Sequence, residues 1–206
     1  GNLNTAKRYG STAGTQTAGV YFGGSPGSTI AEETEEYDGS SWTASGDLNT
    51  GRATAGGTGI QTAALCIGSY PAGAIVESYN GTSWTEIGDL TGGRHNLSSA
   101  GTTTAALAFG GENATAILAI SEEWDGSSWT EGSDMNTGKY ASAGAGTQTS
   151  ALSMTGDDPP GARTANVESY NGSSWTEVGN VNSARYALAG DGASNTSAII
   201  AGGIDT

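Results

Sequence analysis

The side chains best suited to chemistry in this sequence are cations and carboxylates that recur at fixed positions. Most of the Lys and Arg residues begin Gly/Ala/Ser/Thr-rich segments, and a set of glutamates stands two residues before an aromatic residue. The cations are Arg8, Arg52, Arg94, Lys139 and Arg185, and the glutamates are Glu35, Glu77, Glu122 and Glu168. Because a buried cation needs a hydrogen-bonding partner, we predict partly buried ion pairs that stabilise the fold. The alternative is a ring of cations that reads a polyanion.

The remaining residues give little support for catalysis or metal binding. His95 is the only histidine, and neither a metal site nor a Ser-His-Asp arrangement has partners at readable spacing. Paired acids such as Asp157-Asp158 lack the spacing of a calcium loop, so we interpret them as solvated surface charge. The single cysteine, Cys66, lies in an apolar run and is expected to be a buried hydrophobe. We therefore predict no catalytic residue, no metal and no cofactor.

The charge balance excludes two classes of partner. The formal net charge is −14 and the pI is near 4.1, which disfavours nucleic acid and anionic membrane surfaces. No apolar stretch reaches the roughly 18 to 20 residues of a membrane span. The chain begins at Gly1 without an initiator Met or a signal peptide, as we would expect of a processed product, an excised fragment or a recombinant piece.

The recurring residues belong to a repeat. Four copies of Tyr/Trp-Asp/Asn-Gly-Ser/Thr-Ser-Trp-Thr carry Trp42, Trp84, Trp129 and Trp175, spaced 42 to 46 residues apart. Each copy has four short segments rich in small, β-branched or aromatic residues and bounded by turn residues, and none has helical periodicity. Asp-Gly and Asn-Gly between the last two segments are strong hairpin signals. Each copy is therefore predicted to be a four-stranded antiparallel meander.

The combined pattern resembles the kelch repeat. A basic residue is followed by an apolar strand that ends in Gly23-Gly24, then by Tyr37 and, five residues later, by Trp42, and the likeness extends over essentially the whole chain. The uniform copies look like the low-complexity kelch-like repeats encoded by bacteria and marine phages. The resemblance implies an all-β fold, a β-propeller of four-stranded antiparallel blades, without implying one function. Copper chemistry, found on some kelch-related propellers, needs two histidines, and this chain has one.

The copies run from end to end as one domain, residues 1–206. They span approximately residues 8–48, 52–90, 94–135 and 139–181, with a partial copy at 185–206. Four complete blades and half of a fifth are therefore expected. Either a ring of about five blades closes with a reduced last blade, or the chain is part of a longer one. The tryptophans could be sugar-stacking platforms, but their identical placement favours packing between blades.

The connection between the second and third segments differs from copy to copy, whereas the other connections are nearly constant. Variable loops on a constant framework are where binding is usually built, although drift in unconstrained loops is an equal alternative. The candidate contacts on these connections are Tyr70, Asn113, Asp157 and Arg163.

The function expected from these features is a non-catalytic binding or structural module. We expect display outside a cell or on a virion, such as a phage tail or fibre, where the module recognises a protein or receptor within a larger assembly. A lectin-like propeller that binds a surface glycan is one alternative. A fragment of a larger enzyme is the other.

Overall fold

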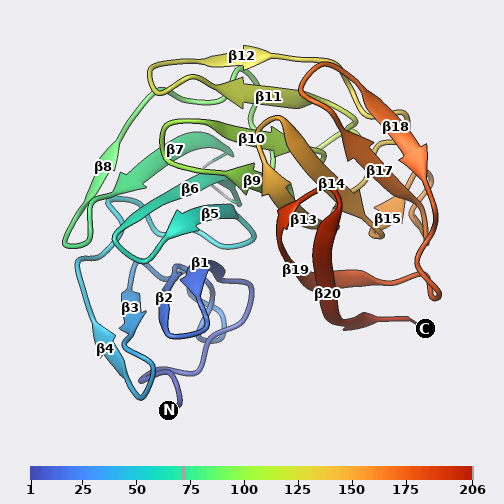
Figure 1. Cartoon of the computed structure of the whole chain (residues 1–206). Helices are drawn as coiled ribbons and strands as arrows, with labels where there is room; N and C mark the ends of the chain where they lie inside the picture. The colour runs from blue at the N-terminus through green and yellow to red at the C-terminus, as the bar shows by residue number, and fades with distance from the viewer. Residues whose placement is uncertain (71–72, 206) are drawn as a thin grey trace.

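The computed structural model describes residues 1–70 and 73–205, and every regular element in this part of the chain is a β-strand. The strands form four antiparallel four-stranded sheets and two two-stranded hairpins. Figure 1 shows the four-stranded sheets fanned around a common centre, with the N-terminal sheet at one end of the arc and the C-terminal hairpin at the other. The radial all-β arrangement predicted from the repeat is confirmed.

Each sheet follows chain order from the centre outward. The first contains β1 (Ser11–Thr15), β2 (Ala18–Phe22), β3 (Thr34–Tyr37) and β4 (Trp42–Ala44). The second contains β5 (Gly56–Ile60), β6 (Ala63–Ser69), β7 (Gly73–Tyr79) and β8 (Trp84–Glu86). The third contains β9 (Ser98–Gly101), β10 (Ala106–Phe109), β11 (Ser121–Trp124) and β12 (Trp129–Glu131). The fourth contains β13 (Ala143–Thr147), β14 (Ser150–Met154), β17 (Val167–Tyr170) and β18 (Trp175–Val178).

Two hairpins complete the structure. The strands β15 (Asp157–Asp158) and β16 (Ala162–Arg163) pair within the connection between β14 and β17. The strands β19 (Tyr186–Ser194) and β20 (Ser197–Ile204) form a fifth sheet with two strands instead of four. In Figure 1 the arc stays open between this fifth sheet and the first. The expected half blade is present, but it does not close a five-bladed ring.

The turn between the third and fourth strands follows directly from the repeated Asp/Asn-Gly. In the first sheet, Asp38 Oδ1 accepts hydrogen bonds from the amides of Ser40 and Ser41, both at 2.8 Å. Gly39 has a φ of 93°, a left-handed conformation that glycine adopts without a steric penalty. Asn80, Asp125 and Asn171 make the same contacts in the other sheets. These side-chain bonds fix the register of each outer hairpin.

A chain of backbone hydrogen bonds links all five innermost strands. A residue at or near the start of each of these strands is left-handed although it is not glycine, with φ between 51° and 61° at Tyr9, Thr54, Asn96, Ala141 and Ala187. From Thr54 onward, each amide in this set donates to the carbonyl of the preceding member, at 2.8 to 2.9 Å. The left-handed conformation, unusual for such residues, turns each amide toward the neighbouring sheet. The sheets are thereby held together by main chain as well as by side chains.

The repeated tryptophans pack between sheets. Trp84 lies edge-on against Phe22 of the preceding sheet with ring centroids 4.8 Å apart, and its indole Nε1 donates to Thr34 Oγ1 at 2.9 Å. Trp175 repeats this arrangement with Phe109 and Ser121. Trp129 packs in a cluster with Ile67 and Val76. Trp42, at the open end of the arc, is only half-buried because no described sheet precedes it.

Two kinds of side-chain pair alternate along the interfaces between neighbouring sheets. Tyr79 donates its hydroxyl to Glu36 of the preceding sheet at 2.7 Å, and Tyr170 donates to Glu123 at 2.6 Å. Between the second and third sheets the corresponding residues are Ser78 and Trp124, and Trp124 Nε1 instead donates to the carbonyl of Thr103 in its own sheet. The tyrosine therefore occurs where the preceding sheet offers a carboxylate, and the tryptophan occurs where it does not.

One interface lacks a hydrogen bond that its counterparts make. Trp129 Nε1 is buried without a partner among the described residues, because Val76 stands where Thr34 and Ser121 accept the equivalent indole. Val76→Thr should raise the free energy of unfolding by about 1 kcal/mol by supplying the acceptor, measured as a higher urea midpoint. The matched control, Thr34→Val, should lower it. A lower midpoint for Val76→Thr would show that the indole is already satisfied, for example by water.

Candidate binding face

Three of the five repeated cations, Arg52, Arg94 and Lys139, lie inside the molecule, and each meets a glutamate of a third strand. Arg52 pairs with Glu77 and Arg94 with Glu122, and all four side chains are fully buried. Lys139 Nζ lies 3.4 Å from Glu168 Oε1, and burial lowers the pKa of this lysine although the glutamate opposes the shift. The glutamates also accept backbone amides of the preceding segment, such as Asn49 N on Glu77 at 2.8 Å. Cations placed in this way are inaccessible to a polyanion.

In the first copy the cation is Lys7, so the prediction of Arg8 is wrong. Lys7 Nζ lies 4.0 Å from Glu35 Oε1 and 3.6 Å from Glu33 Oε2, and its side chain is fully buried. Arg8 is exposed and donates to the carbonyl of Gly27 at 3.4 Å. The residue that follows the cation is the one that pairs with the next connection, and in this copy that residue is Arg8.

The connections between second and third strands emerge on one side of the arc, which we call the connection face (residues 23–33, 68–73, 110–120 and 155–166). The residue after each cation forms an isolated β-bridge to the start of the connection, at Arg8–Ser25, Ala53–Tyr70, His95–Glu112 and Tyr140–Asp157. These bridges bring the residues that follow the cations onto the same face as the variable connections. Residues 71 and 72 of the second connection lie outside the described residues.

A row of polar and aromatic side chains crosses the connection face from the second sheet to the fifth. Its members are Tyr70, His95, Glu112, Tyr140, Asp157, Arg163 and Tyr186. The Tyr70 and His95 rings lie with centroids 5.8 Å apart, and His95 Nε2 is 3.5 Å from Glu112 Oε1. Glu112 Oε1 also accepts Asn96 Nδ2 at 2.9 Å. Tyr70 is 57% exposed, so this end of the row presents an open aromatic surface beside a carboxylate.

The other end of the row is held by a tyrosine–carboxylate pair and a cation–aromatic pair. Tyr140 donates its hydroxyl to Asp157 Oδ2 at 3.0 Å. Burial, this hydrogen bond and the charges of Asp157 and Glu112 raise the pKa of Tyr140 to about 12, so the phenol stays protonated. The guanidinium carbon of Arg163 lies 4.8 Å from the centroid of the Tyr186 ring, within the range of a cation–π contact. A ligand lying across the row would meet aromatic faces, the Glu112 carboxylate, an imidazole and one guanidinium.

Of the four predicted contacts, three belong to this row. Tyr70 and Arg163 are exposed, whereas Asp157 is only 6% exposed. Asn113 is exposed, but its Oδ1 accepts the amides of Thr115 and Ala116 at 2.9 and 3.0 Å, so the side chain shapes its own turn. His95, Glu112, Tyr140 and Tyr186 were not among the predicted contacts. The signal for His95, Tyr140 and Tyr186 was the variable position immediately after the repeated cation, which the misassignment of Arg8 concealed. Glu112 lies on a variable connection, next to the predicted Asn113.

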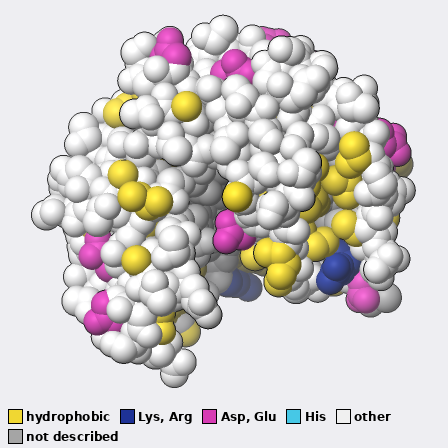
Figure 2. Space-filling view, viewed as in Figure 1, with side chains coloured by type: hydrophobic (Ala, Val, Ile, Leu, Met, Phe, Trp, Pro, Cys, Tyr) yellow, Lys and Arg dark blue, Asp and Glu magenta, His cyan; other side chains and the backbone are white. Residues whose placement is uncertain are grey.

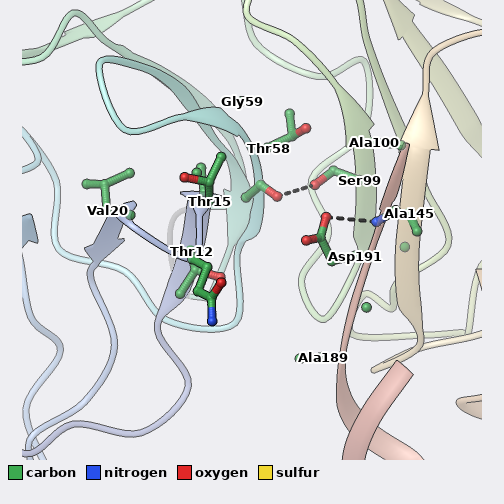
Figure 3. A pocket seen from close by; sticks show the side chains of 18 of the residues that line it. Thr12, Thr15, Val20, Thr58, Gly59, Ser99, Ala100, Ala145, Ala189 and Asp191 are labelled. Atoms are coloured by element: carbon green, nitrogen blue, oxygen red, sulfur yellow. Dashed lines mark hydrogen bonds between the residues drawn. The ribbon is translucent and has the colours of Figure 1, made fainter. Parts of the chain in front are cut away.

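The centre of the arc holds a cavity of about 590 Å³ that opens toward the gap between the end sheets. Figure 3 shows it lined by small side chains of the inner strands. Several of its hydroxyls are already used between sheets: Thr58 Oγ1 donates to the carbonyl of Gly101 at 2.8 Å, and Ser99 Oγ donates to that of Gly57 at 3.0 Å. Asp191 is its one charged lining residue in the described part of the chain. The cavity therefore offers less recognition chemistry than the connection face.

Neither a metal-binding cluster nor a membrane-spanning helix is found among the described residues. No group of three or more His, Cys, Asp or Glu side chains lies close enough there to hold a metal ion. None of the described segments is a helix with the length and apolar character needed to cross a membrane. Figure 2 shows carboxylates spread around the rim and apolar side chains gathered over the limb of the arc that carries the later strands.

Comparison with known proteins bears on the fold. No protein-family model matches the sequence, and no curated protein matches it either. Among solved structures, that of YjhT superposes with a TM-score of 0.78, covering 98% of this chain and 74% of that chain at 17% sequence identity. The fold is that of a β-propeller. At this level of identity the likeness concerns architecture alone, and it agrees with the radial sheets of Figure 1.

Proposed function

We propose that this propeller is a non-catalytic binding module that engages a protein or a surface glycan through the connection face. The observation that carries the proposal is the row from Tyr70 to Tyr186, in which side chains from successive sheets converge on the one face whose loops differ between copies. Aromatic side chains and arginine are the residues most often central to binding surfaces. Display on a cell or virion surface, as in a phage tail or fibre, fits the strongly acidic chain.

A glycan is the ligand class that a specific observation favours. The exposed Tyr70 ring stands against His95 and beside the Glu112 carboxylate, which together offer an apolar ring face and a strong hydrogen-bond acceptor. Sugar rings present C–H groups and hydroxyls side by side, so both elements would be used. Cys66 supplies no nucleophile here, because the thiol is buried and burial raises its pKa to about 12.

The test uses labelled protein on an oligosaccharide array and on intact bacterial cells, untreated, periodate-oxidised or protease-treated. We expect the double variant Tyr70→Ala/His95→Ala to bind at least about ten-fold more weakly, as is typical when central contacts are removed. Ser127→Ala, in an exposed turn between a third and a fourth strand, is the matched control and should bind normally. Loss of cell binding after periodate would assign a glycan, and loss after protease a protein. Equal binding by wild type and the double variant would refute the proposed face.

A further inference from the structure

The last sheet has an unpaired edge where every other sheet is continued. In each of the four complete sheets the second strand is hydrogen-bonded to a third, but β20 pairs only with β19 within the described residues. Ile199 on β20 is 68% exposed, whereas its counterparts Val20, Leu65 and Leu107 are buried. An edge strand of this length presents a row of free amides and carbonyls, which is a template for pairing with another strand.

At this edge Arg185 also lacks a carboxylate partner within residues 1–70 and 73–205, in addition to the unpaired backbone groups of β20. It occupies the position of Lys7, Arg52, Arg94 and Lys139, each of which lies beside a glutamate of a third strand. Arg185 Nη1 donates to the carbonyl of Gly202 at 3.0 Å, but its buried Nε has no partner among the described residues. The described part of the chain gives this guanidinium no carboxylate.

The repeat defines which residue of β20 the missing glutamate would lie opposite. In the complete sheets the glutamate stands opposite the fourth residue of the second-strand segment, as in the pairs Tyr21–Glu35, Cys66–Glu77, Ala108–Glu122 and Ser153–Glu168. The corresponding residue of β20 is Ile200. We propose that the free edge of β20 binds an acidic β-hairpin segment whose glutamate lies opposite Ile200 and pairs with Arg185.

The neighbouring sheet specifies which kind of hairpin fits. An added hairpin would pack against Val167 and Ser169 of the fourth sheet, which correspond to Val76 and Ser78 of the second. In this chain the Val76/Ser78 surface receives the third-sheet hairpin, with its Trp124 and Trp129. Hairpins of the tyrosine type, which have Tyr79 or Tyr170 in place of Trp124, instead pack against surfaces that carry Glu36 or Glu123. The occupant therefore has a tryptophan at both aromatic positions.

A second copy of this chain does not meet these requirements. Its third and fourth strands are already hydrogen-bonded to each other and to the second strands of their own sheets, so the described part of a second copy has no free hairpin of this kind to add to β20. Pairing through its own β20 edge fails for another reason. The segment Ser197–Ile204 contains no Asp or Glu, so pairing two such edges would give neither Arg185 a carboxylate. The inference concerns a surface apart from the connection face, and it stands or fails independently of the proposed function.

The test uses the whole chain and a fluorescent synthetic peptide with the sequence of residues 118–133, which includes Glu122, Trp124 and Trp129. We expect saturable binding in fluorescence anisotropy, with new hydrogen-exchange protection confined to Ser197–Ile204. A Glu122→Gln peptide should bind at least about ten-fold more weakly, as expected for an uncompensated guanidinium. A peptide of residues 164–179, the tyrosine type, should bind more weakly than the 118–133 peptide.

A double-mutant cycle distinguishes a specific ion pair between Arg185 and the peptide glutamate from nonspecific binding of the peptide. Against the Arg185→Gln protein, the wild-type and Glu122→Gln peptides should bind equally, because the charge pair is absent in both cases. Arg8→Gln, at an exposed position beside the first sheet, is the control and should leave the ten-fold difference intact. The inference is overturned if the two peptides bind wild-type protein equally, if the protection appears elsewhere, if no peptide binds, or if sedimentation shows β20 occupied by a second copy.

Discussion

Arg52→Ala is expected to lower the free energy of unfolding by about 3 to 5 kcal/mol, the effect of removing one partner from a buried ion pair. Arg52 is 1% exposed and donates to the carbonyls of Ile75 at 2.8 Å and Thr50 at 3.2 Å as well as to Glu77. Its loss leaves the Glu77 carboxylate buried without its counter-charge and detaches the segment before β5 from β7. Urea denaturation followed by far-ultraviolet circular dichroism measures the effect.

Two further variants identify the cause of that loss. Arg8→Ala removes a cation of the same kind from an exposed position and should change stability by less than about 0.5 kcal/mol. Arg52→Met combined with Glu77→Leu removes both charges and should recover part of the stability, because no uncompensated charge remains. An unchanged urea midpoint for Arg52→Ala, with binding to cells abolished, would instead mean that the cation serves a ligand.

Trp84→Ala should destabilise the fold by about 3 to 5 kcal/mol, the usual range for truncating a buried tryptophan. Trp84 is 5% exposed, lies against Phe22 and donates its indole hydrogen to Thr34. Truncation therefore opens a cavity between two sheets and also leaves the Thr34 hydroxyl without its donor. The thermal midpoint and the urea midpoint should both fall.

Trp42→Ala is the matched control, because it removes the same side chain from the same position of the repeat. Trp42 contacts Tyr37 of its own sheet but is only half-buried at the open end of the arc. The expected loss is about 1 kcal/mol, in proportion to the smaller area removed from water. Equal losses for Trp42→Ala and Trp84→Ala would mean that the outer face of the first sheet is covered in solution.

The sequence was sufficient to predict the sheets because each signal for them is local. The Asp/Asn-Gly turns, the short β-branched runs and the repeated tryptophans act within one copy, and the strands lie where those signals place them. Closure of the ring was not predictable, because it depends on the small rotation between successive sheets. The Lys7-Arg8 pair was ambiguous for another reason: two cations stand side by side, and the left-handed backbone at Tyr9 decides which one turns inward.

The candidate site was only partly predictable. Variable connections pointed to the connection face, but the row on that face joins residues from different copies, such as Tyr70 and His95. Their proximity depends on how far one sheet is offset from the next, and hydrophobic patterning does not encode that offset. Asn113 shows the opposite error, since an asparagine in a variable loop is as useful for closing its own turn as for binding.

The Glu36–Tyr79 and Glu123–Tyr170 hydrogen bonds alternate with an interface at which Ser78 and Trp124 occupy the corresponding positions. This alternation limits how the gene for such an array can lengthen. A recombination event that inserts one unit would set a phenol against a serine or an indole against a carboxylate. Inserting two consecutive units preserves both matches. Arrays of this kind are therefore expected to grow by pairs, and a census of unit types along a longer array would show a two-unit period.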